Sequence, residues 1–210
     1  MKFNIFCRIN WNTLHWTRPS GDAVRLKGGR SFAAENGFGF EEWLFNFNWE
    51  DDDGYKYGFL QPIHKQYRKY NNETGSVILY SKPEDWWFVA KIDNCHVLSE
   101  KEKEEAYDFH EKKGWLEEMK EHLELLNLDG RLVKQNREYL FNIRFKKEDV
   151  TFLDPYILVP ADHKIRRTPR YQTLLGTFDF NSLAAKTKLL DYPAWFKSIT
   201  NESRKTVSST

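Results

Sequence analysis

The chain has 210 residues, and its 8 Trp, 10 Tyr and 16 Phe supply too much apolar surface for a disordered chain. With 11 Gly and 2 Cys it is neither collagen-like nor a disulfide scaffold, and no apolar run reaches the roughly 18–20 residues of a membrane span. The net charge is +1, but the charges are unevenly distributed along the chain. Residues 1–34 carry six basic and one acidic side chain, and residues 100–124 carry ten acidic and five basic side chains. We expect a cytoplasmic protein with reduced cysteines and no membrane partner, whose separated charges permit a basic face.

The first half of the chain is predicted as short strands between long loops. Alternating residues 3–10 indicate a half-buried strand, and a polar loop follows from residue 12 to residue 30. Residues 41–49 are typical of a short helix that leads into a strand. Asp53-Gly54 favours a hairpin turn before a strand over residues 55–61. Further strands are predicted at residues 76–80 and 86–97.

One helical segment is predicted at about residues 100–128. Ser99 and Glu102 form a capping-box pattern ahead of it, and Asp129-Gly130 ends it. Leu116, Met119, Leu123 and Leu126 recur at helical spacing and predict the buried stripe. Gly114 predicts a break or kink within the segment.

The last third contains less regular structure in this interpretation. Residues 139–145 alternate as a strand, residues 151–170 contain three prolines and are predicted as mostly loop, and residues 183–196 favour a short helix. We expect a single domain over residues 1–197 and a polar tail or linker over residues 198–210. The fold class is predicted as α+β, with a curved, mostly antiparallel sheet or small open barrel and a long helical insertion.

Most catalytic chemistries lack their sequence signals. The six histidines show no metal-ligand spacing, no GxSxG motif occurs, and Gly37-Phe38-Gly39 lacks the third glycine of a dinucleotide fingerprint. We therefore expect no metal and no cofactor. Glu41 and Glu42 resemble an acid/base pair, but adjacent helical carboxylates diverge, so only one is expected to point inward.

Three aromatic and polar segments remain, at residues 11–19, 35–43 and 58–62. Aromatic faces can stack on bases, and Asn, Gln and Glu side chains can bind base edges. Alternatively, Trp43 is a core residue, whereas core and site are equally favoured for Trp11 and Trp16. Basic side chains nearby are candidates for contacts with phosphates, namely Arg8, Arg18, Arg25, Lys27, Arg30, Lys65 and Arg68.

These segments carry a family resemblance. The set W-N-x-x-x-W-T-R-P-S-G-D, E-N-G-F-G-F-E-E-W-L-F-N-F and Y-x-Y-G-F-L-Q-P resembles an N-terminal domain of HNH-type and McrB-like restriction proteins, similar to the EVE-like branch of the PUA superfamily. The resemblance is strongest over residues 8–65 and fades through residue 145. It implies a reader of modified bases that extrudes one base into an aromatic cage. The implied base-pocket residues are Trp11, Asn12, Trp16, Asn36, Phe38, Glu41, Trp43 and Gln61.

The leading hypothesis is a non-catalytic module that binds double-stranded DNA with modified bases, for a restriction or phage-defence system. No nuclease or ATPase module follows within the 210 residues, so we expect such an effector in cis or in trans. One alternative is a small metal-dependent nuclease of the ASCH type that uses Glu41, Lys56 or His64. The other is a protein-interaction domain whose partner binds the charged helix over residues 101–126.

Overall fold

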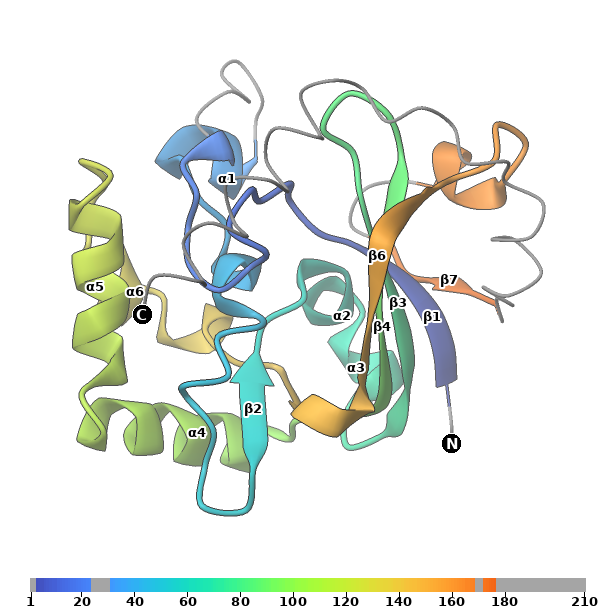
Figure 1. Cartoon of the computed structure of the whole chain (residues 1–210). Helices are drawn as coiled ribbons and strands as arrows, with labels where there is room; N and C mark the ends of the chain where they lie inside the picture. The colour runs from blue at the N-terminus through green and yellow to red at the C-terminus, as the bar shows by residue number, and fades with distance from the viewer. Residues whose placement is uncertain (1–2, 24–30, 169–171, 177–210) are drawn as a thin grey trace. The chain divides into compact units, whose positions relative to one another are not determined.

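The computed structural model describes residues 3–23, 31–168 and 172–176, which all belong to one compact unit spanning residues 1–177. These residues form one mixed sheet with short helices around it (Figure 1). The predicted helix at 183–196, the domain boundary at 197 and the tail at 198–210 lie outside the described residues. The strands are β1 (Phe3–Arg8), β2 (Tyr55–Gly58), β3 (Thr74–Ser81), β4 (Trp87–Val97), β5 (Ile143–Lys146), β6 (Val150–Leu158) and β7 (Leu174–Leu175).

The sheet has the strand order β2-β5-β4-β3-β1-β7, and β6 pairs with β4 beside this path. Only β1 and β3 pair in parallel among the described strands, with Phe3 opposite Gly75 and Arg8 opposite Tyr80. The prediction of an α+β fold with a mostly antiparallel sheet is therefore confirmed. The described strands do not close into a barrel, because β2 and β7 at the two ends of the order are not paired with each other.

The predicted helical segment consists of two helices, α4 (Glu100–Lys112) and α5 (Trp115–Glu124). The capping box is present, since Ser99 Oγ accepts from Glu102 N and Glu102 Oε2 accepts from Ser99 N. Gly114 separates the helices with φ of 80°, a backbone conformation that glycine adopts easily. None of the described helices is long and apolar enough to cross a membrane.

The remaining helices are short, and several of them border the end of β1. Their sequences give one turn each, which tertiary packing rather than intrinsic propensity must stabilise. They are α1 (Phe32–Asn36), η2 (Phe40–Trp43), α2 (Gln61–Lys65), α3 (Tyr67–Tyr70), α6 (Leu132–Gln135), η3 (Arg137–Tyr139), η4 (Lys147–Asp149) and η5 (Lys164–Arg167).

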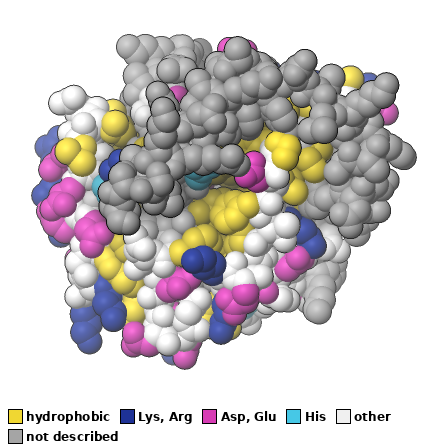
Figure 2. Space-filling view, in the orientation of Figure 1, with side chains coloured by type: hydrophobic (Ala, Val, Ile, Leu, Met, Phe, Trp, Pro, Cys, Tyr) yellow, Lys and Arg dark blue, Asp and Glu magenta, His cyan; other side chains and the backbone are white. Residues whose placement is uncertain are grey.

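A hydrophobic cluster joins the helical segment to the aromatic segment that precedes β2. Leu116, Met119 and Leu123 of α5 are buried against Trp43 and Trp49, as the helical stripe predicts, whereas Leu126 of that stripe lies past the end of α5 and is half-buried. Charged side chains of both signs mix over α5, whereas hydrophobic side chains reach the surface near the centre of the face in Figure 2. The helical segment is thus packed into the core along one side only.

Several predicted elements differ from the structure, and the strand predicted over residues 139–145 begins only at Ile143, after η3. Residues 150–158 form β6 rather than loop, because β4 supplies a partner strand that a proline count does not reveal. β6 pairs with β4 on one side only, so it is an edge strand. An edge strand tolerates Pro155, because the N–H that proline lacks is not required on the unpaired side. Residues 44–49 form turns and bends instead of a strand, and an isolated bridge joins the next residue, Glu50, to Lys56.

Candidate nucleotide-base pocket

A pocket of about 320 Å³ lies at the end of β1, where α1 and η2 meet α2 and η3. Its walls come from β1 and the residues after it, from α1, η2 and η3, and from both ends of α2. In volume it falls at the lower end of the range for small-molecule sites. The lining residues are Arg8, Asn10, Ser31, Phe32, Ala33, Gly39, Phe40, Glu41, Phe59, Gln61, Lys65, Asn136 and Tyr139.

Four aromatic rings form the apolar part of this pocket. Phe32 packs on Phe40 with ring centroids 5.1 Å apart, Phe40 on Phe59 at 6.1 Å, and Phe59 on Tyr139 at 6.2 Å. Phe40 and Phe59 are buried, whereas Phe32 and Tyr139 are half-buried. A row of rings with two half-exposed members suits a flat, aromatic ligand.

The polar part of the pocket is built around Glu41, the second residue of the 3-10 helix η2. The backbone N–H of Asn10 donates to Glu41 Oε1 at 3.1 Å, and both residues are buried. A β-carbon on Gly39 would lie 2.5 Å from Asn10 Nδ2 and 2.5 Å from Glu41 Oε2. The glycine therefore lets an amide and a carboxylate lie together at the pocket wall, where they can bind a donor and an acceptor of one ligand edge.

Cationic and amide side chains complete the lining. Lys65 at the end of α2 is exposed, while Arg8 is half-buried with its guanidinium 5.2 Å from the Trp86 ring centroid. Gln61 opens α2, and Asn136 lies between α6 and η3. The pocket thus combines aromatic walls with two positive charges, as a base attached to a phosphate would require.

Both carboxylates of the Glu41-Glu42 pair are buried, so the expectation that only one points inward was wrong. Glu42 Oε1 accepts from Gly39 N, and Glu42 Oε2 accepts from Ser20 N and from Asn12 Nδ2. A 3-10 turn spaces residues differently from an α-helix, so Glu41 can line the pocket while Glu42 ties η2 to the preceding loop. Burial raises the pKa of Glu42 to about 8, and its three N–H donors oppose that shift.

Asn12 lies in the structure as a loop anchor rather than as a pocket residue. Its side chain is 1% exposed and donates to Arg18 O and to Glu42. Its oxygen accepts from the backbone N–H groups of Leu14 and Trp16. All of these bonds hold the turn after β1, which leaves this amide engaged within the fold.

The tryptophans expected in a cage do not line the pocket. Trp16 is 1% exposed and donates from Nε1 to Asn10 O, while Trp43 is 3% exposed and donates to His122 Nδ1. Trp11 is half-buried and packs edge-on against Trp16 and Tyr156. Trp16 and Trp43 are therefore core residues, which is the alternative to a role in a base pocket.

Of the other predicted site residues, some line the pocket and others lie elsewhere. Phe38 is buried among aromatic rings, and Asn36 caps the end of α1 by donating to Phe32 O. Glu41, Gln61, Arg8 and Lys65 come together in the pocket. Arg18 and Arg68 are exposed outside its lining, and the predicted phosphate contacts Arg25, Lys27 and Arg30 lie outside the described residues.

Sequence reasoning missed Asn10, Phe32, Phe59, Asn136 and Tyr139 of the pocket. Asn10 borders the segment at residues 11–19, and Phe59 lies within the segment at residues 58–62, whose Gln61 is the predicted site residue. Asn136 and Tyr139 are about 75 residues further along the chain than Gln61, and no local pattern places them beside β1. Only tertiary packing of the helical segment brings them to the pocket.

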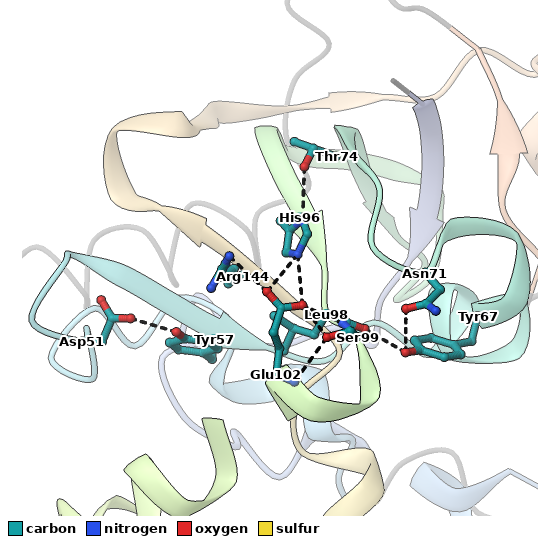
Figure 3. Close-up of polar contacts among 10 residues, drawn as sticks. All are labelled: Asp51, Tyr57, Tyr67, Asn71, Thr74, His96, Leu98, Ser99, Glu102 and Arg144. Carbon is teal, nitrogen blue, oxygen red and sulfur yellow. Dashed lines mark hydrogen bonds and ion pairs between the residues drawn. The ribbon is translucent and has the colours of Figure 1, made fainter. Parts of the chain in front are cut away.

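A second polar cluster, at the C-terminal end of β4, connects α4 to the sheet (Figure 3). Glu102 lies at its centre, bound by His96 at 3.2 Å, by Arg144 at 3.1 Å and by the Ser99 hydroxyl at 2.8 Å. Thr74 on β3 contacts the other ring nitrogen of His96 at 3.1 Å. Each of these groups has its partner within the fold, so the cluster is structural.

The residues named for a nuclease lie apart. Lys56 is 1% exposed beneath the ring of Trp49, with 5.6 Å from its Nζ to the ring centroid, and it is not part of the pocket lining. His64 packs on Tyr139 with centroids 4.7 Å apart, behind the pocket wall. In the described part of the chain, no group of three or more His, Cys, Asp or Glu residues is placed to hold a metal ion.

Comparisons of this chain with protein-family models, with curated proteins and with solved structures give no significant match. The candidate site therefore rests on its own geometry and on the sequence motifs that border it.

Proposed function

We propose that this chain is a non-catalytic DNA-binding domain that takes one modified base out of a duplex and into the pocket beside β1. The observation that carries the proposal is the lining of that pocket. Four rings form its apolar walls, Glu41 lies within it, and Arg8 and Lys65 add positive charge. A flipped base needs apolar walls with a few fixed polar groups, and its phosphates need cations.

The sequence motifs support the same assignment. All of the lining residues except Asn136 and Tyr139 lie within residues 8–65, the stretch in which the resemblance to base-reading domains is strongest. A PUA or EVE-like relationship of the open, mostly antiparallel sheet is part of this proposal. The remaining part is an effector, a nuclease or ATPase in cis or in trans, which would act once the base is bound.

The test is binding to duplexes that differ in one base modification only, each measured at two salt concentrations. We expect one modified duplex to be preferred at both concentrations. Glu41→Gln keeps the acceptor for Asn10 N and removes the charge, so it should reduce that preference by about tenfold, the size of one base-edge contact. Lys65→Ala should weaken binding to all duplexes alike and lower the salt slope by about one.

The matched control is Lys101→Ala, because Lys101 is an exposed lysine on α4 away from the pocket lining. Its affinity and salt slope should equal those of the wild type. Equal, salt-sensitive binding of all duplexes would reduce the proposal to a basic patch. Cleavage of the duplex in Mg²⁺ that disappears in Glu41→Gln would replace it with the nuclease alternative.

A further inference from the structure

The turn over residues 13–16, here called the Leu14 turn, has an unusual backbone. His15 and Trp16 have φ of 54° and 55°, so two consecutive non-glycine residues adopt the left-handed region. Each such residue costs roughly 1–2 kcal/mol relative to an ordinary conformation. A fold retains that cost only where its surroundings fix the conformation.

Hydrogen bonds on both sides fix the Leu14 turn. Asn12 Oδ1 accepts from Leu14 N at 2.8 Å and from Trp16 N at 3.0 Å. The buried Trp16 ring donates to Asn10 O at 2.9 Å, and Trp16 O accepts from Phe45 N at 2.9 Å. The turn is therefore a rigid part of the fold.

The same contacts place the turn beside the pocket. Asn10 lines the pocket and holds the Trp16 ring, and Asn12 binds the residue that follows Glu41 in η2. Four residues of chain span at most about 14 Å, so Leu14 lies within that distance of Asn10.

The turn presents an apolar side chain with polar and basic neighbours. Leu14 is 37% exposed, one of four large hydrophobic side chains with such exposure in the described residues. His15 and Arg18 are exposed as well, and the His15 ring is held by Tyr156 OH at 3.2 Å. Apolar side chains on rigid supports can enter a base stack, while flanking basic groups contact the backbone.

We propose that Leu14 enters the DNA duplex at the place from which the base has left, and that Arg18 contacts the adjacent strand backbone. This inference rests on the proposed function and adds a second contact element to the pocket. Extrusion of a base leaves a gap in the stack, and an apolar side chain in that gap offsets part of the cost of unstacking.

The test compares wild type with Leu14→Ala on three DNAs that carry the same modified base: a paired duplex, a duplex with that base opposite a mismatch, and a single strand. We expect Leu14→Ala to lose about tenfold in affinity for the paired duplex and little for the other two, whose base is already unpaired. The control is Leu125→Ala, since Leu125 is a 73% exposed leucine at the end of α5.

A second readout is a fluorescent base analogue placed next to the modified base. A neighbouring base quenches this fluorescence more strongly than contact with the turn does. Binding of the wild type should therefore raise the fluorescence, and binding of Leu14→Ala should raise it less. Unchanged affinity of Leu14→Ala for the paired duplex, or equal loss on all three DNAs, would overturn the inference while leaving the pocket proposal intact. Absence of binding by the wild type to all three DNAs would overturn both proposals.

Discussion

Lys56 is the most unusual single residue in the described chain, a buried ammonium among aromatic side chains. Its Nζ donates to Tyr57 O at 2.5 Å and lies over Trp49. Burial lowers its pKa from 10.5 to about 7, and Glu50 opposes the shift. Burial, and then the positive charge of Lys56, also lower the pKa of His110 to about 3. A polar centre of this kind makes stability sensitive to pH.

The free energy of unfolding should therefore rise with pH above 7. The unfolded chain keeps Lys56 protonated up to pH 10.5, whereas the folded chain releases that proton near pH 7, so folding releases a proton between these values. Relative to Lys56→Met, the wild type should gain about 2 kcal/mol between pH 7 and pH 9. Urea titrations of both proteins at these pH values measure the difference, with Lys101→Met as the exposed control. Parallel curves would contradict the assignment.

At the residue scale, the sequence patterns predicted the kinds of side chain in the site better than they predicted which individual residues line it. The motifs predict Glu41 and Gln61, the nearby basic side chains predict Arg8 and Lys65, and the pocket contains all four. Trp16 was named from the same motifs, because a tryptophan in a polar loop resembles an exposed ring. Its burial depends on Asn12 and Phe45, whose contacts with it arise only when the loop folds onto η2.

At the scale of elements, the α4–α5 corner has a local cause. Gly114 has φ of 80°, and a β-carbon there would meet nothing within 4 Å. A substitution at this position therefore changes backbone strain without a steric clash. The corner directs α5 against Trp43 and Trp49, and Asn136 and Tyr139, which follow further along the chain, reach the pocket.

Gly114→Ala should lower the free energy of unfolding by about 1 kcal/mol, since alanine disfavours the left-handed region. Gly114→Asn should cost less, because asparagine adopts that region more readily. Thermal or urea unfolding of the two variants beside wild type measures the order. Equal stability of Gly114→Ala and wild type would mean that the corner can adjust its backbone.

Elements with a local signal were predicted well, including the alternating strands β1, β3 and β4, whereas β6, which lacks such a signal, was not. Ser99, Glu102 and Gly114 mark the start of α4 and its corner with α5 within a few residues of each. β6 has no such signal, because its three-dimensional partner β4 lies about 60 residues earlier and Pro155 reads as a loop residue. Residues 44–49 form turns where a strand was predicted, and beside β2 only Glu50 makes a bridge, to Lys56.

At the scale of the whole molecule, the separated charges predicted from sequence are attached to different elements. Lys65 and Arg8 line the pocket, whereas α4 and α5 carry the acidic excess, part of which is paired internally, as in the contacts of Arg137 with Glu104 and Asp108. Screening limits exposed charges to a range of about 8 Å at physiological ionic strength. The acidic helices should therefore influence DNA binding far less than the pocket cations do.

Replacement of an acid on α4 should leave DNA affinity almost unchanged. Glu105→Gln removes an exposed carboxylate whose partner is Lys101, and we expect an affinity within about twofold of wild type at physiological salt. Lys65→Gln also changes the charge by one unit, but it removes a cation of the pocket lining. It should weaken binding several-fold. Fluorescence anisotropy with one duplex compares the three proteins. A large gain in affinity for Glu105→Gln would place α4 in the DNA contact.

The position of β7 has a practical consequence for fragments of this protein. Ile5 and Phe6 of β1 pair with Leu175 and Leu174, so the first strand is covered on its outer side by residues from far along the chain. A fragment that ends before residue 174 would leave the outer backbone groups of β1 without hydrogen-bond partners. Bare strand edges pair with those of other molecules. Such a fragment should self-associate at concentrations at which the full chain stays monodisperse, and its preparation should keep residues 172–176.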